Sequence, residues 1–233
     1  VQLARTTDFE MIATGQHYLA DYVQLQQIPL LGRLAAEAGD MTIATGINLL
    51  SLHHPVEIAE QLTTLEALGP NVIAGVGAGY RDVEFESFGI PKSERIPRLI
   101  EGIELMKKLW TDSSVTYDGT HYSVTDASIT PQPTERFPIW IAANAPTAIE
   151  RAARYGDAWF VNPHSKLSEL KKGKRRYDAV CEDLNKDPSV PVFREAFVAP
   201  TTEEAFDIAR PYLKQKYDRY LEWGQDEAMG DGD

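Results

Sequence analysis

A segment that begins at Val72 brings together the residue types that a ligand site requires. It opens as a short apolar run typical of a buried strand, carries Gly75, Gly77 and Gly79 at alternate positions, and continues into polar and aromatic residues. Glycines at the carboxyl end of a strand let a ligand approach the backbone closely, because no Cβ stands in the way. The spacing is not that of a dinucleotide-binding GxGxxG motif, since neither possible register has a glycine at its third position. The pattern therefore predicts a ligand-binding strand end of another kind.

Polar side chains also follow two earlier predicted strands. His17 comes after the strand expected at 9–15, where an imidazole could hydrogen-bond a ligand or act as an acid or base near neutral pH. A purely structural role for His17 is the alternative. Gly46, Ile47 and Asn48 end a second strand with small and amide-bearing residues, which suits a close polar contact with a ligand.

The predicted N-terminus of a helix at 146–155 is a further candidate site. Asn144 could accept hydrogen bonds from the unpaired N–H groups of the helix as a cap. Thr147 lies in the first turn, where free N–H groups and the positive end of the helix dipole favour an anion, and Ala145 leaves the approach open. An ordinary helix cap and a phosphate-binding site both fit these residues.

The histidines and the cysteine do not have the spacing of a metal site. His53 and His54 are adjacent and precede a helix, so we expect caps or surface residues, because they lack the i, i+4 spacing of the zinc motif HExxH. The single cysteine, Cys181, excludes an internal disulfide and a cysteine-rich metal site. It fits the reducing cytoplasm, which is the predicted location, and we expect it to be buried rather than nucleophilic.

Composition narrows the class of protein further. A chain of 233 residues with 43% hydrophobic content can bury a substantial core. The net charge of −12 and the pI of about 4.9 disfavour binding along a nucleic-acid backbone, which needs clusters of Lys and Arg. No apolar run approaches the length of about 20 residues that a membrane span needs. Neither nucleic acid nor a membrane is therefore an expected partner.

Apolar runs and helical periods alternate along the chain. Strands are expected at 9–15, 42–46, 72–76, 139–143, 158–161 and 192–198. Helices are expected at 28–37, from Pro55, at 94–110, 146–155 and 166–185, and from Thr202, with an excursion at 111–138 that includes a short hairpin. Successive β–α units predict an α/β fold with a parallel sheet, which is either an open doubly wound sheet or a (β/α)8 TIM-type barrel.

The barrel is the favoured architecture, because candidate functional residues follow nearly every predicted strand and are not confined to one crevice. Six strands do not close an eight-stranded barrel. We therefore expect a single barrel domain over residues 1–233 that lacks its first and last strands, one before Val1 and one after Asp233.

Three segments, in this order, resemble the bacterial-luciferase-like family of flavin-dependent oxidoreductases. They are TGINLLSLHHPVEIAEQLTTLEAL, GVGAGYRDVEFESFGIPKSER and PIWIAANAPTAIERAARYGDAWF. The resemblance extends from about residue 8 to about residue 165. It implies a (β/α)8 barrel, usually dimeric, that holds reduced FMN or a deazaflavin analogue at the carboxyl ends of its strands.

The resemblance also implies roles for individual residues. The flavin phosphate would lie at Asn144, Ala145 and Thr147, and the ring would lie near Gly46, Ile47 and Asn48, beside a non-prolyl cis peptide. From the next strand the cofactor would be lined by Gly77, Ala78 and Gly79, and His17 would lie close to the reacting edge of the flavin. Two departures, Gln16 in place of a first histidine and Ala78 in place of a phosphate-binding arginine, make light emission an unexpected property.

The function that this resemblance implies is that of an FMN-dependent monooxygenase. Reduced FMN, supplied by a separate flavin reductase, would react with O2 to oxidise a small organic substrate, with His17 as the catalytic acid or base. The alternatives are a deazaflavin-dependent dehydrogenase or reductase of the same fold and a non-catalytic flavin-binding relative. A homodimer is the expected assembly, and no metal is expected.

Overall fold

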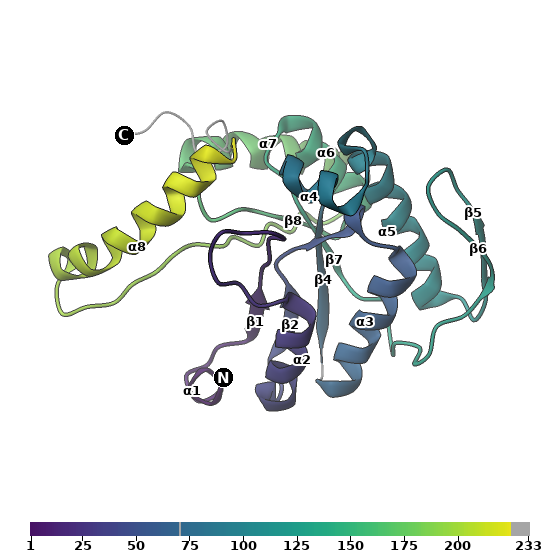
Figure 1. Cartoon of the computed structure of the whole chain (residues 1–233), viewed down its shortest axis with the longest axis horizontal. Coiled ribbons are helices and arrows are strands. Elements are labelled where there is room, and N and C mark those ends of the chain that lie inside the picture. Colours follow the sequence, from purple (N-terminus) through teal and green to yellow (C-terminus); the bar gives the residue numbers. More distant parts are fainter. Residues whose placement is uncertain (70, 225–233) are drawn as a thin grey trace. The chain divides into compact units, whose positions relative to one another are not determined.

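The computed structural model describes residues 1–69 and 71–224 (Figure 1). The chain forms two compact units, of which the first comprises residues 1–142 and 155–157. The second comprises residues 143–154 and the chain from 158 onward. The expectation of a single domain over residues 1–233 stays a prediction.

Parallel strands form the centre of the first unit. β1 (Met11–Thr14), β2 (Thr42–Thr45), β4 (Val72–Gly77) and β7 (Ile139–Ala142) are neighbours in that order, and the short β3 (Asn48–Leu49) also pairs with β4. The pairings are parallel, as the alternation of strands and helices predicts. Every residue of β4 is buried, which is typical of a strand covered on both faces. The predicted strands at 9–15, 42–46, 72–76 and 139–143 are thus confirmed.

Helices of the first unit pack beside one another along this sheet. α2 (Gln27–Ala38), α3 (Pro55–Leu68) and α5 (Arg95–Thr111) lie side by side, with α3 in contact with both of the others (Figure 1). The shorter elements are α1 (Gln2–Arg5), α4 (Asp82–Phe88) and two 3-10 turns at Leu50–Leu52 and Lys92–Glu94. The apolar residues at helical spacing form the core, since Ile58, Leu62, Leu65, Leu99, Ile103 and Met106 are all buried. α4 was not expected from the sequence.

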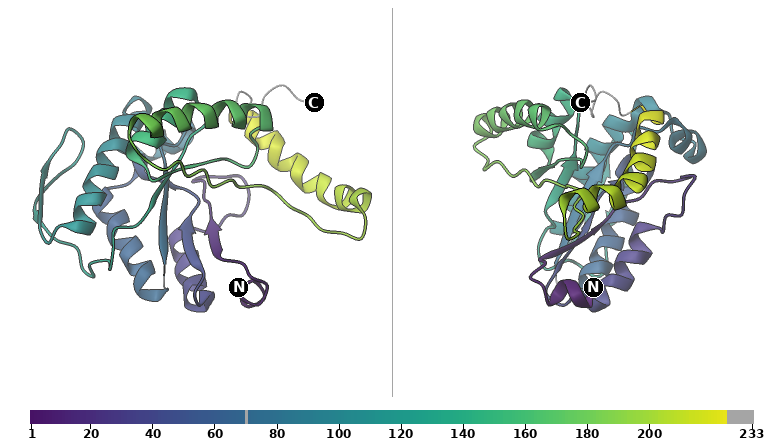
Figure 2. Two further views of the ribbon diagram at one scale, coloured as in Figure 1. Left: turned by 180° about the vertical axis from the view of Figure 1, so that it is seen from behind. Right: turned by 90° about the vertical axis from the view of Figure 1, so that its left-hand side faces the viewer.

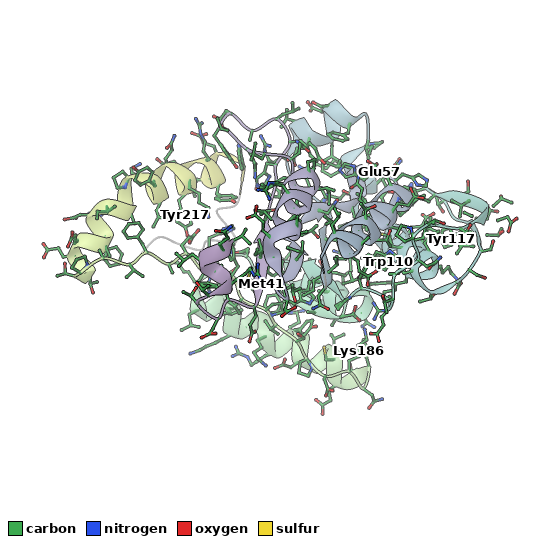
Figure 3. The ribbon with its side chains drawn as sticks, turned by 90° about the horizontal axis from the view of Figure 1, so that it is seen from below. Met41, Glu57, Trp110, Tyr117, Lys186 and Tyr217 are labelled. Atoms are coloured by element: carbon green, nitrogen blue, oxygen red, sulfur yellow. The ribbon has the colours of Figure 1, made fainter. Side chains whose placement is uncertain are left out.

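The excursion after α5 contains the expected hairpin. β5 (Val115–Asp118) and β6 (Ser123–Ala127) pair antiparallel. The buried carboxylate of Glu101 on α5 accepts hydrogen bonds from the backbone N–H groups of His121 (3.0 and 3.1 Å) and Tyr122 (3.0 Å). The hydroxyl of Tyr117 on β5 donates to Glu104 of α5 at 3.4 Å, and Figure 3 labels Tyr117 together with Trp110 near the end of α5. Side chains of α5 therefore fasten the hairpin to the helix.

The second unit consists mainly of helices. It contains α6 (Pro146–Tyr155) up to Arg154, β8 (Ala158–Phe160), α7 (Leu167–Asp183) and α8 (Thr202–Glu222). Its core forms around Trp159, which contacts Tyr177, and around the buried Cys181. The expectation that Cys181 is buried is confirmed, and desolvation raises the pKa of its thiol.

The prediction of a strand at 192–198 is wrong. The segment makes only an isolated parallel bridge between Val161 and Val192, and Figure 2 shows the chain between α7 and α8 without a strand. The side chains of Phe193, Phe197 and Val198 are exposed. The apolar composition of the segment suggested a buried strand, but within the described residues no neighbouring edge pairs with it beyond that one bridge.

Candidate functional site

A polar side chain lies beside an unusual peptide bond where β2 runs into β3. The Gly46–Ile47 bond is a non-prolyl cis peptide and lies in the segment where the family resemblance implies one. Asn48 follows it at the start of β3, opposite Val76 of β4, and is 3% exposed. Its side-chain oxygen Oδ1 is buried and has no hydrogen-bond partner among the described residues. An unsatisfied buried acceptor is costly, so Asn48 fits a ligand that brings an N–H or O–H donor.

The glycines of β4 make room for the protein's own chain. A Cβ on Gly75 would lie 1.8 Å from the carbonyl oxygen of Thr45, and one on Gly77 would lie 2.1 Å from Cδ1 of Ile47. The Thr45 hydroxyl also donates to the carbonyl of Gly75 at 2.7 Å. Gly79 has a φ of +71°, which favours glycine. These close approaches come from β2 and the segment after it, and the role of Gly77 toward a ligand stays a prediction.

A buried ion pair holds the loop after β1. Glu84, whose side chain is 1% exposed, accepts from the Tyr18 N–H at 3.0 Å and lies 3.3 Å from Nη1 of Arg81. Arg81 in turn donates to the carbonyl oxygens of Tyr18 (2.6 Å) and Leu19 (3.3 Å). The Nδ1 atom of His17 lies 3.5 Å from the same Glu84 carboxylate. Arg81 and Glu84 therefore fix the backbone on which His17 and Tyr18 stand.

A pocket of about 550 Å3 opens beside this loop in the first unit. It is lined by residues of the loop after β1, of β3, of the segment before α3, and of α4 itself. Its lining comprises Gln16, Tyr18, Gln26, Ile28, Pro29, Asn48, Leu52, His53, His54, Glu57, Ile58, Gln61 and Phe88. The pocket thus joins the unsatisfied oxygen of Asn48 to several groups that can donate or accept protons.

Tyr18, His53 and Glu57 form a chain of contacts in the pocket wall. The hydroxyl of Tyr18 lies 2.7 Å from Nε2 of His53, and Nδ1 of His53 lies 3.8 Å from Oε2 of Glu57, near the start of α3 (Figure 3). Desolvation lowers the pKa of His53, and the charge of Glu57 opposes this shift. Desolvation also raises the pKa of Tyr18 to about 12. Both rings are therefore neutral at pH 7.

The N-terminus of α6, in the second unit, is accessible. Residues 144–147 are exposed, and the carbonyl of Ala145 accepts from the N–H groups of Ala148 (2.9 Å) and Ile149 (3.0 Å). Asn144 accepts a hydrogen bond from the side-chain amide of Asn162 through its Oδ1 atom. Thr147 lies exposed in the first turn. This helix start has the geometry in which unpaired N–H groups attract an anion.

The predicted site residues are divided between the two units. Gly46, Ile47, Asn48, Gly77, Ala78, Gly79 and His17 belong to the first unit, and Asn144, Ala145 and Thr147 belong to the second. The role of each in cofactor binding stays a prediction. His54 caps α3 by accepting from the Val56 N–H at 3.3 Å, as expected, but His53 is turned into the pocket with its side chain only 14% exposed.

Sequence reasoning missed Glu84 and the contacts of Tyr18. The sequence spacing could have indicated two of the ion pairs. Arg81 and Glu84 are three residues apart, and His53 and Glu57 are four residues apart. The link from Tyr18 to both groups spans many residues and has no local signal.

A family model described as luciferase-like monooxygenase matches residues 1–232. The chain belongs to this family. Among curated relatives, the F420-dependent glucose-6-phosphate dehydrogenase of Beutenbergia cavernae is 32% identical over 171 residues, which cover 68% of this chain and 51% of the relative. The chain thus spans about half the length of that family member.

Solved structures of low sequence identity share the fold. The monooxygenase RslO1 from Streptomyces bottropensis has a TM-score of 0.85 and 23% identity, over 94% of this chain and 70% of that one. The oxygenating constituent of 3,6-diketocamphane monooxygenase from Pseudomonas putida, in complex with FMN, has a TM-score of 0.79 and 18% identity, over 94% and 66%. This luciferase-like chain therefore has the TIM-barrel-type α/β fold that the sequence predicts. The two further strands expected beyond Val1 and Asp233 stay a prediction.

No helix among residues 1–69 and 71–224 combines the length and the apolar character needed to cross a bilayer.

Proposed function

We propose that this luciferase-like protein is an oxidoreductase that binds a deazaflavin and transfers hydride between it and a small organic molecule. The observation that carries the proposal is the buried Oδ1 atom of Asn48, which has no hydrogen-bond partner among the described residues. Asn48 follows the Gly46–Ile47 peptide and lines a pocket that also contains tyrosine, histidine and glutamate side chains. The 32% identity to a relative named as F420-dependent supports the deazaflavin over FMN.

The residues that would hold the cofactor are those predicted from the sequence. Asn48 would accept a hydrogen bond from the ring system, with Gly46 and Ile47 beside it and Gly77, Ala78 and Gly79 at the neighbouring strand end. Asn144, Ala145 and Thr147 would bind the phosphate. When bound, a deazaflavin supplies the chemistry of accepting or donating a hydride.

His17 is the proposed acid or base nearest to the ring. Its Nδ1 atom lies 3.5 Å from the buried carboxylate of Glu84, and its ring packs edge-on against Tyr80 with the centroids 5.9 Å apart. A carboxylate beside one ring nitrogen favours the N–H at that nitrogen and leaves Nε2 to accept a proton. Glu84 thus acts on His17 as a positioning residue.

The substrate that fits the pocket is uncharged. The lining residues include Glu57 and neither Lys nor Arg among those that the structure describes. A phosphate or carboxylate placed there would meet a like charge without a cation to balance it. We therefore propose a small alcohol or carbonyl compound, rather than the sugar phosphate named for the relative from Beutenbergia cavernae.

An FMN-dependent monooxygenase is the second candidate function. The description of the family model, which matches residues 1–232, favours it. In that case a separate flavin reductase would supply reduced FMN, and the same Asn48 and Thr147 would hold it. A homodimer is proposed for either function.

Titration of the chain with the deazaflavin and with FMN, each in oxidised and reduced form, tests the two functions. We expect tighter binding of the deazaflavin, seen as quenching of cofactor fluorescence, and hydride transfer from an uncharged alcohol. Tighter FMN binding with consumption of O2 would favour the monooxygenase. Failure of both cofactors to bind would overturn the proposal.

Variants of Thr147 test whether the cofactor phosphate binds at the start of α6. Thr147→Val should weaken binding of either cofactor by about 1 kcal/mol, or about fivefold in Kd, because it removes one hydroxyl donor. Thr147→Ser keeps the hydroxyl and serves as the matched control. Equal affinities in the two variants would contradict this placement.

A further inference from the structure

We propose that Tyr18, His53 and Glu57 form a proton relay that carries the hydroxyl proton of the substrate from the pocket to solvent. The relay rests on the proposed hydride transfer, since removal of a hydride from an alcohol leaves its hydroxyl proton to be removed as well. His17 does not line the pocket, so the hydroxyl proton leaves through the relay, and His17 would hydrogen-bond the cofactor ring.

All three side chains line the pocket, and solvent exposure increases from His53 to Glu57. Tyr18 and His53 both line the pocket and are joined at 2.7 Å, within hydrogen-bond distance. The side chain of His53 is 14% exposed, whereas that of Glu57 is 53% exposed. A proton that reaches His53 therefore has an exit to solvent along Glu57.

The carboxylate of Glu57 sets the tautomer of His53. At 3.8 Å it is within ion-pair range of Nδ1 but beyond a direct hydrogen bond. A neutral imidazole has a single N–H, and the nearby negative charge favours its position at Nδ1. Nε2 then presents a lone pair to the Tyr18 hydroxyl. Tyr18 donates to His53 in this arrangement, and its oxygen, which also interacts with the side chain of Gln16, can accept from a substrate hydroxyl through its remaining lone pair.

The proton balance of the step follows from this arrangement. A bound deazaflavin would supply the hydride acceptor, taking both electrons of the C–H bond, so that an alcohol would become a carbonyl compound and its hydroxyl proton would have to be removed. That hydroxyl proton passes to the oxygen of Tyr18 as the Tyr18 proton passes to Nε2 of His53. The imidazolium then releases its Nδ1 proton to water beside Glu57. Because both transfers occur together, the buried Tyr18 never carries the negative charge that its raised pKa disfavours.

Other groups around the relay are neutral or hold it in place. Phe88 of α4 contacts the His53 ring edge-on, with the centroids 5.7 Å apart, and contacts Tyr18 at 4.7 Å. Tyr122 of the hairpin segment donates its hydroxyl to the carbonyl of His53 at 3.1 Å. The Tyr18 ring also experiences the charge of Glu84. Among the groups named here as contacts of Tyr18 and His53, Glu57 is thus the charged group closest to the His53 imidazole.

The first test uses the ligand-free protein and does not depend on a cofactor. Nitrogen-15 NMR of histidine should show His53 as the Nδ1–H tautomer at pH 7. Glu57→Gln should lower the pKa of His53 further, because the carboxylate charge raises it in the wild type. A predominant Nε2–H tautomer, or a His53 pKa that Glu57→Gln leaves unchanged, would overturn the relay.

The second test separates proton transfer from binding. His53→Gln should lower kcat for alcohol oxidation about 100-fold and remove the rise of kcat with pH, while Kd for the deazaflavin changes less than twofold. Tyr18→Phe should lower kcat comparably. An unchanged pH profile of kcat in His53→Gln would contradict the relay.

His121→Gln is the matched control. Nδ1 of His121 lies 3.5 Å from a Glu94 carboxylate with its side chain 13% exposed, but it does not line the pocket, so kcat and its pH profile should stay at wild-type values. A wild-type protein that binds neither cofactor would overturn the proposed function, whereas the NMR result on His53 would test the arrangement of Tyr18, His53 and Glu57 by itself.

Discussion

The buried carboxylate of Glu84 holds the backbone beside the pocket through hydrogen bonds and ion pairs. Glu84 is almost wholly buried and contacts Arg81, the N–H of Tyr18 and the imidazole of His17. Removing one partner of such a group leaves a buried charge uncompensated, which costs far more than the pair contributes. At the residue scale, the site therefore depends as much on Glu84 as on the side chains that face the pocket.

Gly75 is the residue whose substitution should disturb the sheet most. Gly75→Ala would place a Cβ 1.8 Å from the carbonyl oxygen of Thr45, which is backbone and cannot turn away. We expect the free energy of unfolding to fall by about 3 kcal/mol or more.

Urea denaturation of Gly75→Ala measures this loss, with Gly32→Ala as the matched control. Gly32 lies within helix α2, and a Cβ there would meet only side-chain atoms of Leu65 and Leu68, at 3.9 Å. The control should leave stability unchanged or raise it by about 0.5–1 kcal/mol. Similar stabilities of the two variants would show that the sheet relaxes around Gly75.

His164, in the second unit, should make stability depend on pH. Desolvation, with Lys216 and Arg194 nearby, lowers its pKa to about 4, and its ring packs 4.8 Å from that of Tyr220. Between pH 6.5 and about 4 the unfolded chain binds a proton that the folded imidazole does not bind, so stability falls as the pH falls through this range.

The comparison of unfolding free energies at pH 7.5 and pH 4.5 tests this linkage. In His164→Gln the loss of stability on acidification should be smaller than in the wild type, because that proton uptake is gone. Equal losses in both proteins would assign the acid sensitivity to carboxylates alone.

At the scale of elements, α5 is the support of the hairpin β5–β6. Glu101→Gln should weaken the bonds from His121 and Tyr122, because a neutral amide accepts less strongly than a carboxylate and brings an N–H group of its own into a buried position. We expect stability to fall by about 1–3 kcal/mol and the amide hydrogens of 121 and 122 to exchange faster with deuterium.

Glu104→Gln, on the exposed side of the same helix, is the control for the hairpin. Glu104 accepts the long hydrogen bond from the Tyr117 hydroxyl and none from residues 121 and 122. The amide hydrogens of these two residues should therefore still exchange slowly. Slow exchange in Glu101→Gln as well would mean that strand pairing alone holds the hairpin.

The elements that could be predicted are those with a strong local pattern. The helix at 94–110 shows a complete apolar face, and the observed α5 covers Arg95–Thr111. The segment 192–198 has apolar residues but no partner strand, and pairing between distant segments is not visible in a local pattern. The same limit applies to the site, because the bond from Tyr18 to Glu84 joins residues 66 positions apart.

At the scale of the whole molecule, the net charge of −12 should oppose the arrival of an anionic cofactor. Raising the ionic strength from about 10 to 150 mM shortens the screening length from about 30 to 8 Å. The association rate constant of FMN should therefore rise several-fold with salt, as measured by stopped-flow fluorescence.

Riboflavin, which lacks the phosphate, is the control for this charge effect and should show no comparable dependence on salt. An FMN rate that falls with salt would instead indicate a local positive field at the phosphate site, strong enough to outweigh the acidic surface.

The bond from the Tyr122 hydroxyl to the carbonyl of His53 connects the hairpin segment to the backbone that carries the imidazole in the pocket. Exchanging the hairpin for one of another length or composition would thus alter acid–base behaviour without changing any residue that a substrate could touch. In engineered chimaeras of such chains, the insertion and His53 should be transferred together.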